Sequence, residues 1–247
     1  ILDHDSGLAI NNFRGIVTFR VGLPDITLSN PIAPTDALQL RQDGFTPPAQ
    51  QTLLQWQTQL ATQVAKLYKD GNNTDGWSNL GRSTIMFSAG ATLYDAYATE
   101  NAFKVDADIL FDTTGKFLVV GVATFGNSLT LGVKLYADLS PVFNGTTATN
   151  PVTILFLMDF PAQGKGAVSP PILSIYGVMQ FKTSNGGFEI DLFGEADLNI
   201  MGGFKASLVG DLSMVFSATS FQLTLSNVSL DVSYLGQIGT AAGNLTI

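Results

Sequence analysis

The sequence predicts a mainly β fold, an antiparallel curled sheet that is barrel-like or a sandwich, with one amphipathic helix at about residues 48–69 packed on it. The first observation is the alternation of apolar residues with polar or small ones, as in GFEIDLFGEADLNI at residues 187–200. This two-residue period is typical of strands with one apolar face. The second is that short turns join these stretches, which favours antiparallel pairing because parallel strands need longer crossovers. The third is that a single stretch has helical spacing.

The N-terminal part, about residues 1–82, is expected to contain this helix. Residues 12–29 alternate as one or two strands, and NPIAPTD at 30–36 reads as a proline-rich connection. From Pro47 to Gly71 the apolar residues step by three or four, which predicts one apolar stripe on a helix that covers one side of the sheet. The stripe consists of Leu53, Trp56, Leu60, Val64 and Leu67.

The remaining part, about residues 83–247, is expected to be continuous antiparallel β structure of ten to twelve strands. TTGK at 113–116 and SNGG at 184–187 are predicted hairpin turns, and TILFLMDF at 153–160 is predicted to be a fully buried strand. A glycine recurs in mid-strand in VVGVAT, TLGVKL, IYGVMQ, LFGEAD, LVGDLS and YLGQIG. Such glycines indicate bends in a strongly coiled sheet or small residues that fit beneath neighbouring Phe side chains.

The chain is expected to form one β-rich domain over residues 1–247. It begins without Met and ends inside a strand pattern. We interpret it as a fragment of a longer chain.

Composition argues against several functions. Hydrophobic residues make up 45% and charged residues 13%, the net charge is −8, and there is no cysteine. Without a basic stripe, nucleic acid is a poor partner. No apolar run reaches the ~18 residues of a membrane helix, so no membrane span is expected. His4 is the only histidine, which argues against a Ser-His-Asp triad and against zinc. We therefore expect the protein not to be an enzyme.

One loop resembles an oxygen-rich calcium site. DGNNTDG at 70–76 offers Asp70, Asn72, Thr74 and Asp75 as ligands. The full EF-hand pattern fails, because Asp75 stands where Gly belongs and Gly81 where Glu belongs. A structural calcium is the one cofactor hypothesis, and an ordinary helix-terminating turn is the alternative.

Two further sets of residues are candidates for binding or catalysis. Trp77, between Gly76 and Ser78, is a candidate for stacking on a glycan, or else a lid residue folded over the core. A glycosidase needs two carboxylates. Six carboxylates on predicted strands are candidates for this pair, and the simplest interpretation is that they point outward into solvent. They are Asp106, Asp108, Glu189, Asp191, Glu195 and Asp197.

The segments TLYDAYATENAFKVDADILFDTTGKFLVVGVATFGNSLTLGVKLYADLS, ILFLMDFP and LSIYGVMQF resemble β-rich modules of very large planctomycete-type bacterial cell-surface proteins that are adhesin-like. The resemblance covers roughly residues 85–240. It implies a modular, extracellular architecture. It implies no known activity, so no site residues carry over from it.

These observations favour a non-catalytic structural or adhesive module of a large exported bacterial protein, at the cell surface or outside the cell. Such a module would self-associate, even into a filament, and its partners would be like modules, neighbouring domains or glycans. The alternative is a carrier of lipid or another hydrophobic ligand in a β-groove, and a carboxylate-dependent glycosidase is third. An open apolar groove wider than ~8 Å favours the carrier, whereas a filled two-layer core ~10 Å deep favours the structural module.

Overall fold

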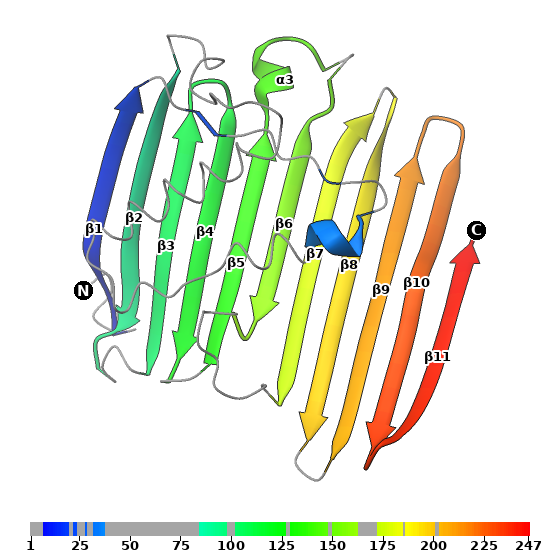
Figure 1. The fold of residues 1–247 in the computed structure, drawn as a ribbon. Helices are drawn as coiled ribbons and strands as arrows, with labels where there is room; N and C mark the ends of the chain where they lie inside the picture. The colour runs from blue at the N-terminus through cyan, green and yellow to red at the C-terminus, as the bar shows by residue number, and fades with distance from the viewer. Residues whose placement is uncertain are drawn as a thin grey trace, which may run out of the picture.

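A computed structural model shows one eleven-stranded antiparallel sheet in which the strands follow chain order from β1 to β11 (Figure 1). It describes residues 7–19, 22–23, 28, 32–37, 84–97, 102–126, 129–147, 150–162, 172–184, 186–200 and 203–247. The predicted helix at 48–69 lies outside these residues. The sheet is open, with β1 and β11 as its two edges.

The strands are long and most are joined by short turns. They are β1 (Leu8–Phe19), β2 (Ile85–Asp95), β3 (Phe103–Asp112), β4 (Lys116–Phe125), β5 (Leu129–Asp138), β6 (Thr153–Phe160), β7 (Leu173–Ser184), β8 (Gly187–Ile200), β9 (Phe204–Phe216), β10 (Phe221–Tyr234) and β11 (Gln237–Thr246). A short helix α3 (Ser140–Phe143) follows β5, and one helical turn lies at 34–37. The predicted mainly β, antiparallel fold of ten to twelve strands is confirmed. The expected barrel-like or sandwich form is not, because the described strands form one sheet that is not closed.

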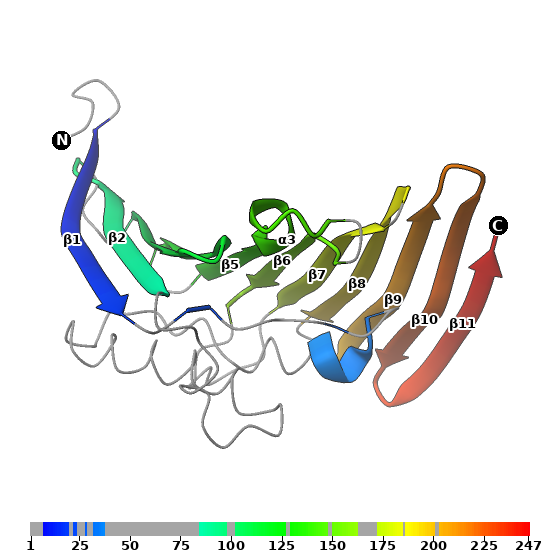
Figure 2. The ribbon, with the colours of Figure 1, turned by 90° about the horizontal axis from the view of Figure 1, so that it is seen from above.

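The described residues between β1 and β2, at 22–23, 28 and 32–37, pack on one face of the sheet. We call these residues the N-terminal segment and this face the covered face. Figure 2 shows the helical turn at 34–37 on that side. On the other side, which we call the open face, α3 near the end of β5 is the only described helix or strand (Figure 2). The buried cluster joins Leu23, Leu28, Ile32 and Ala37 to strand residues that include Leu110, Leu118, Tyr136, Leu157 and Tyr176.

Polar side chains of the covered face hold this segment in place. The backbone N–H of Leu23 donates to Asp112 Oδ2 at 2.7 Å, and that of Leu28 donates to Gln180 Oε1 at 3.3 Å. The hydroxyl of Tyr176 donates to the carbonyl oxygen of Ala37. Buried backbone groups need such partners, so the polar residues of this face are matched to a protein layer.

A buried ion pair fixes the edge strand β1 to β3 across β2. Arg14 Nε and Nη2 lie 2.7 and 2.5 Å from the two carboxylate oxygens of Asp108, and the side chains are 10% and 5% exposed. Gly90 lies between them, and a Cβ there would stand 1.9 Å from Asp108 Oδ1. Glycine on β2 therefore leaves the space through which the pair forms.

Removing the arginine should destabilise the fold. Arg14→Met leaves the Asp108 carboxylate without its guanidinium partner, and breaking a buried pair costs about 3–5 kcal/mol. We expect a loss of that order in the free energy of unfolding at pH 7, measured by urea denaturation. The double variant Arg14→Met/Asp108→Leu is the control and should recover much of the loss. A single-variant loss under about 1 kcal/mol would contradict the role given to the pair.

The pH dependence of this group has a definite sign. Burial raises the pKa of Asp108 above its ordinary value, although the hydrogen bond and charge of Arg14 lower it. The folded state therefore binds the proton more tightly than the unfolded state. The contribution of Asp108 to stability rises as pH falls through the folded pKa and levels off below the unfolded pKa. The destabilisation of Arg14→Met should accordingly shrink on acidification.

Candidate functional site

The open face is apolar on every strand. Two neighbouring rows of register partners, one from β1 to β10 and one from β1 to β11, contain no polar side chain. One row is Val17, Phe87, Phe111, Phe117, Ala137, Ile154, Phe181, Ile190, Met214 and Leu223. The next is Gly15, Ala89, Ile109, Val119, Leu135, Phe156, Met179, Leu192, Leu212, Leu225 and Leu245.

These side chains are not packed inward. Ile109 is 52% exposed, Phe111 42% and Phe156 36%, and Ala137 is the one fully buried described side chain in the two rows. The alternating apolar residues of β8 and β9 do not line a filled interior in the described part of the chain, because residues 22–23, 28 and 32–37 pack on the opposite face. The expectation of a fully buried strand at 153–160 is also wrong, since only every second residue of β6 is buried.

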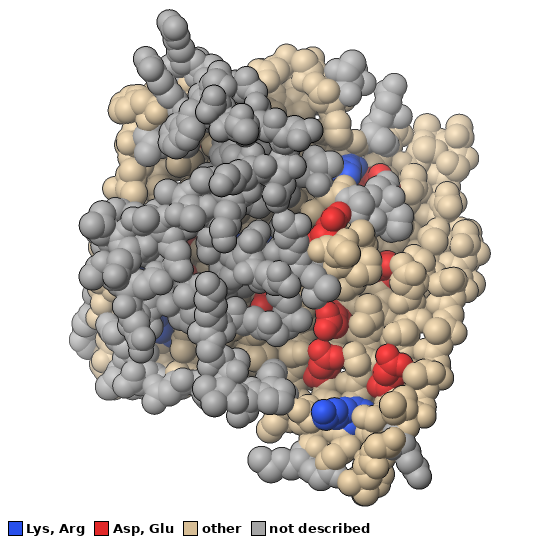
Figure 3. Space-filling model, viewed as in Figure 1, with Lys and Arg blue, Asp and Glu red and all other residues tan. Residues whose placement is uncertain are grey.

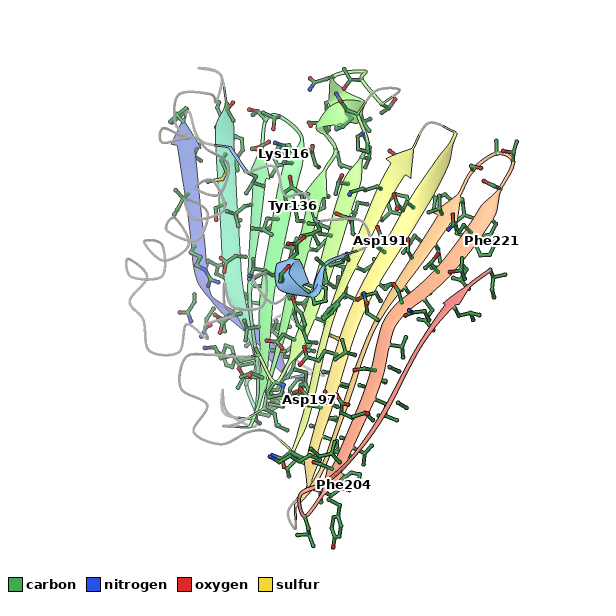
Figure 4. The ribbon with its side chains drawn as sticks, turned by 45° about the vertical axis from the view of Figure 1, so that its right-hand side comes forward. Lys116, Tyr136, Asp191, Asp197, Phe204 and Phe221 are labelled. Carbon is green, nitrogen blue, oxygen red and sulfur yellow. The ribbon has the colours of Figure 1, made fainter. Side chains whose placement is uncertain are left out.

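Aromatic rings gather at both ends of the open face. Phe181, Phe188, Phe216 and Phe221 form a continuous chain at one end, with ring centroids 5.8, 4.5 and 4.8 Å apart. At the other end Phe103 and Phe125 contact each other at 5.4 Å. Figure 4 shows Phe221 and Phe204 at opposite ends of the strands. Phe103 and Phe111 on β3 are eight residues apart, so the apolar band is about 27 Å tall.

A row of glycines crosses the centre of the open face. Gly177, Gly194 and Gly210 pair directly across β7, β8 and β9, and Gly121 lies in the same row on β4. Gly194 and Gly210 form the floor of a shallow depression of about 480 Å³, and Gly177 lies beside them on β7. On the open face its walls are Ile175, Leu192, Leu208, Leu212, Leu225 and Val228.

Two β-bulges lie near the ends of this row. In β1 the register shifts between Asn11 and Arg14, and in β10 it shifts between Ser226 and Ser229. Each bulge holds an asparagine with positive φ, Asn12 at 51° and Asn227 at 53°. Bulges increase local twist, so the glycine row follows a line along which the sheet bends.

Acidic side chains lie on the covered face, over β8 and its neighbours (Figure 3). The interpretation of all the strand carboxylates as solvated is wrong: Asp106, Asp108 and Asp191 are buried. Among the described residues, neither oxygen of Asp191 has a hydrogen-bond partner, nor has Oδ1 of Asp211. The second oxygen of Asp211 accepts from Asn227 Nδ2 at 2.6 Å. This burial arises from the protein layer that lies on the covered face, which the sequence pattern did not reveal.

Asp106 and Asp108, two of the six candidate catalytic carboxylates, already have side-chain partners. Asp108 pairs with Arg14, and Asp106 accepts from Thr92 and pairs with Lys104 at 2.9 Å. Among the described residues no three His, Cys, Asp or Glu side chains gather as metal ligands. The proposed calcium ligands Asp70, Asn72, Thr74 and Asp75, and the proposed stacking residue Trp77, lie outside the described residues.

Comparison with protein-family models, with curated proteins and with solved structures finds no match. The resemblance to planctomycete-type surface modules therefore stays a prediction. Within the described ranges, no helix has the length and apolar character of a membrane-spanning segment. The functional argument rests on the geometry of the two faces.

The unpartnered Asp191 gives a stability test. Leaving a buried polar group unsatisfied costs about 1–3 kcal/mol, and more when it is charged. We expect Asp191→Asn, which keeps the shape and removes the charge, to raise the free energy of unfolding at pH 7 by about 1 kcal/mol.

Asp197→Asn is the matched control, because Asp197 lies on the same face of β8 (Figure 4) and is only half-buried. It should change stability by less than about 0.5 kcal/mol. If Asp191→Asn instead lowered stability in a urea titration, the carboxylate would have a partner in solution and would not be an orphan.

Proposed function

We propose that the protein binds lipid molecules by their hydrocarbon chains on the open face of the sheet. The observation that carries the proposal is the open face itself: eleven strands wide, without charge between its end rows, and half-buried or exposed almost throughout. An open apolar groove is the feature that favours a carrier over a filled structural module, and the depression over Gly194 and Gly210 on this open apolar face supports it. Lipid carriage, the second hypothesis from the sequence, is therefore the function that the geometry supports best.

The size of the open face requires an occupant. Eleven strands spaced ~4.8 Å apart and an apolar band about 27 Å tall give a surface on the order of 1,000 Å². Single soluble chains rarely expose a contiguous apolar patch larger than a few hundred Å². The face is therefore covered when the protein works, and its lack of charge selects an apolar partner.

The relief of the face favours hydrocarbon chains over a second copy of the protein. At the centre of the face the glycines leave the surface close to the backbone, whereas at the ends the Phe rings project from it. Two rigid copies related by a twofold axis along this row would set hollow against hollow. Protein interiors are close-packed, and voids destabilise them. Flexible chains follow such a surface and fill it.

The sheet edges favour individual lipid molecules over immersion in a bilayer. The band height of about 27 Å is close to the ~30 Å hydrocarbon core of a membrane. However, β1 and β11 are edge strands whose outer backbone groups have no strand partner in the sheet. Such groups cost several kcal/mol each in hydrocarbon and little in water. A sheet that holds lipid chains on its face while its edges stay in water avoids this cost.

A self-associating structural role is the second candidate, and the edge strand β11 favours it. This strand has ten residues without charge or proline, whereas natural edge strands usually carry Lys, Pro or short lengths that prevent pairing. Light scattering over a range of concentrations tests it. Growth of the apparent mass with concentration, abolished by Ala242→Lys on β11, would support edge-to-edge association.

Purified protein should carry lipid. We expect organic extraction and mass spectrometry to recover acyl-chain lipids from the wild type. Ile109→Glu and Leu230→Glu place a charge on the open face and should lower the recovered lipid several-fold, because a carboxylate in hydrocarbon is strongly unfavourable. Ile238→Glu makes the same change at an exposed position on the covered-face side of β11 and should not lower the amount of lipid recovered.

Two experiments distinguish binding of single lipid molecules from insertion into a bilayer. In the first, palmitate below its solubility limit is titrated into delipidated protein. In the second, the protein is floated with phosphatidylcholine vesicles. Binding of palmitate, with an affinity that changes less than about two-fold with salt because the face is uncharged, supports the carrier. Stable vesicle insertion without palmitate binding, or no lipid in either experiment, would overturn it.

A further inference from the structure

The glycines of the open face have no explanation inside the sheet. Glycine in a strand interior is destabilising by roughly 0.5–1 kcal/mol relative to alanine. It is retained where positive φ or a close approach requires it. Gly177, Gly194 and Gly210 have none of the positive φ values seen at the turn glycines.

Nor does crowding require them. A Cβ on Gly194 would have no atom within 4 Å, and a Cβ on Gly177 would meet only the Phe193 carbonyl oxygen at 3.7 Å. Only Gly210 is tight, with Val228 Cγ2 at 3.4 Å. By contrast, a Cβ on Gly90 would clash with the Arg14–Asp108 pair. Two adjacent glycines thus keep empty a space that the described part of the chain does not fill.

We propose that one fatty acyl chain lies in this space, crossing β7, β8 and β9 over Gly177, Gly194 and Gly210. The proposal rests on the proposed lipid-binding function and names where, and in what orientation, a chain is held. The chain runs perpendicular to the strands because the glycines are register partners, so their row crosses the sheet.

The dimensions of the groove suit a linear chain. The row of three glycines beneath the proposed chain spans two strand spacings, about 10 Å from Gly177 to Gly210. The walls of the groove are the rows two residues to either side, with Leu192 and Leu212 on one side and Ala196 and Leu208 on the other. Each wall row stands about 7 Å from the floor row along the strands. A narrow apolar ligand fits between these rows, and a broad one rests on top of them.

The chemistry of the lining selects the chain and not a headgroup. Every open-face side chain around the groove is aliphatic. Asp211 and Glu195 also border it, but their side chains project to the covered face, as the register of β8 and β9 shows. No side chain of the groove therefore offers a charge or a hydrogen bond to a polar ligand.

Filling the floor tests the proposal. Gly194→Val places three carbon atoms in open space, in a residue type that strands favour. We expect it to fold at least as well as the wild type and to bind palmitate about ten-fold more weakly, because several methylene contacts are lost. Gly121→Val is the matched control. It lies in the same glycine row on the same face, beyond Val133 and Met158, and its Cβ also has room.

Palmitate affinity is measured by displacement of a fluorescent fatty acid, and folding by thermal denaturation. The groove is supported if palmitate affinity falls in Gly194→Val and stays within about two-fold of wild type in Gly121→Val. Equal binding by all three proteins overturns the groove while leaving the lipid-binding face intact. Equal weakening in both variants places the chain along the whole row and overturns the assigned position. Absence of palmitate binding in the wild type refutes the proposed function itself.

Discussion

The structure depends on one constraint: a sheet that is apolar on one whole face has its protein layer on the other face. Antiparallel sheets usually pack their apolar face on a core and turn the polar face to water. Here the N-terminal segment lies over the face that holds Asp112 and Gln180 and uses them as acceptors for its backbone N–H groups. The uniformly apolar face is left uncovered by the described chain. Both the fold and the proposed function follow from this packing of chain on the face with polar side chains and not on the apolar face.

The covered face has apolar and polar parts with different roles. Leu110, Tyr136 and Leu157 in its centre supply the buried contacts that hold the N-terminal segment. The Arg14–Asp108 pair ties the first edge of the sheet to its interior. Asp191 on β8 and Asp211 on β9 are buried without full hydrogen bonding, which lowers the stability of this part of the sheet. The described residues that stabilise the fold thus pack on the face opposite the proposed lipid-binding surface.

The sequence predicted the strands well and the faces poorly. Alternation and turn residues located the hairpins, because side-chain period and turn chemistry are local properties. The choice of which face is covered is not a local property of the sequence. Strand β6 is apolar on both faces, with Leu155 and Leu157 on one and Phe156 and Met158 on the other, and only the packing of a distant segment distinguishes them. The recurring glycines were visible, but their alignment in one row depends on the register of every hairpin. The candidate site at 70–77 lies outside the described residues and stays a prediction.

The central claim is that lipid chains contact the open face and not the covered face. Because the chain has no cysteine, single cysteines along β8 can each be labelled with a fluorophore and exposed to lipid that carries a nitroxide on its acyl chain. Ile190→Cys, Leu192→Cys and Leu198→Cys should be quenched, and Glu189→Cys and Asn199→Cys should not, which gives a two-residue period. Quenching at all positions alike, or at none, would contradict the account.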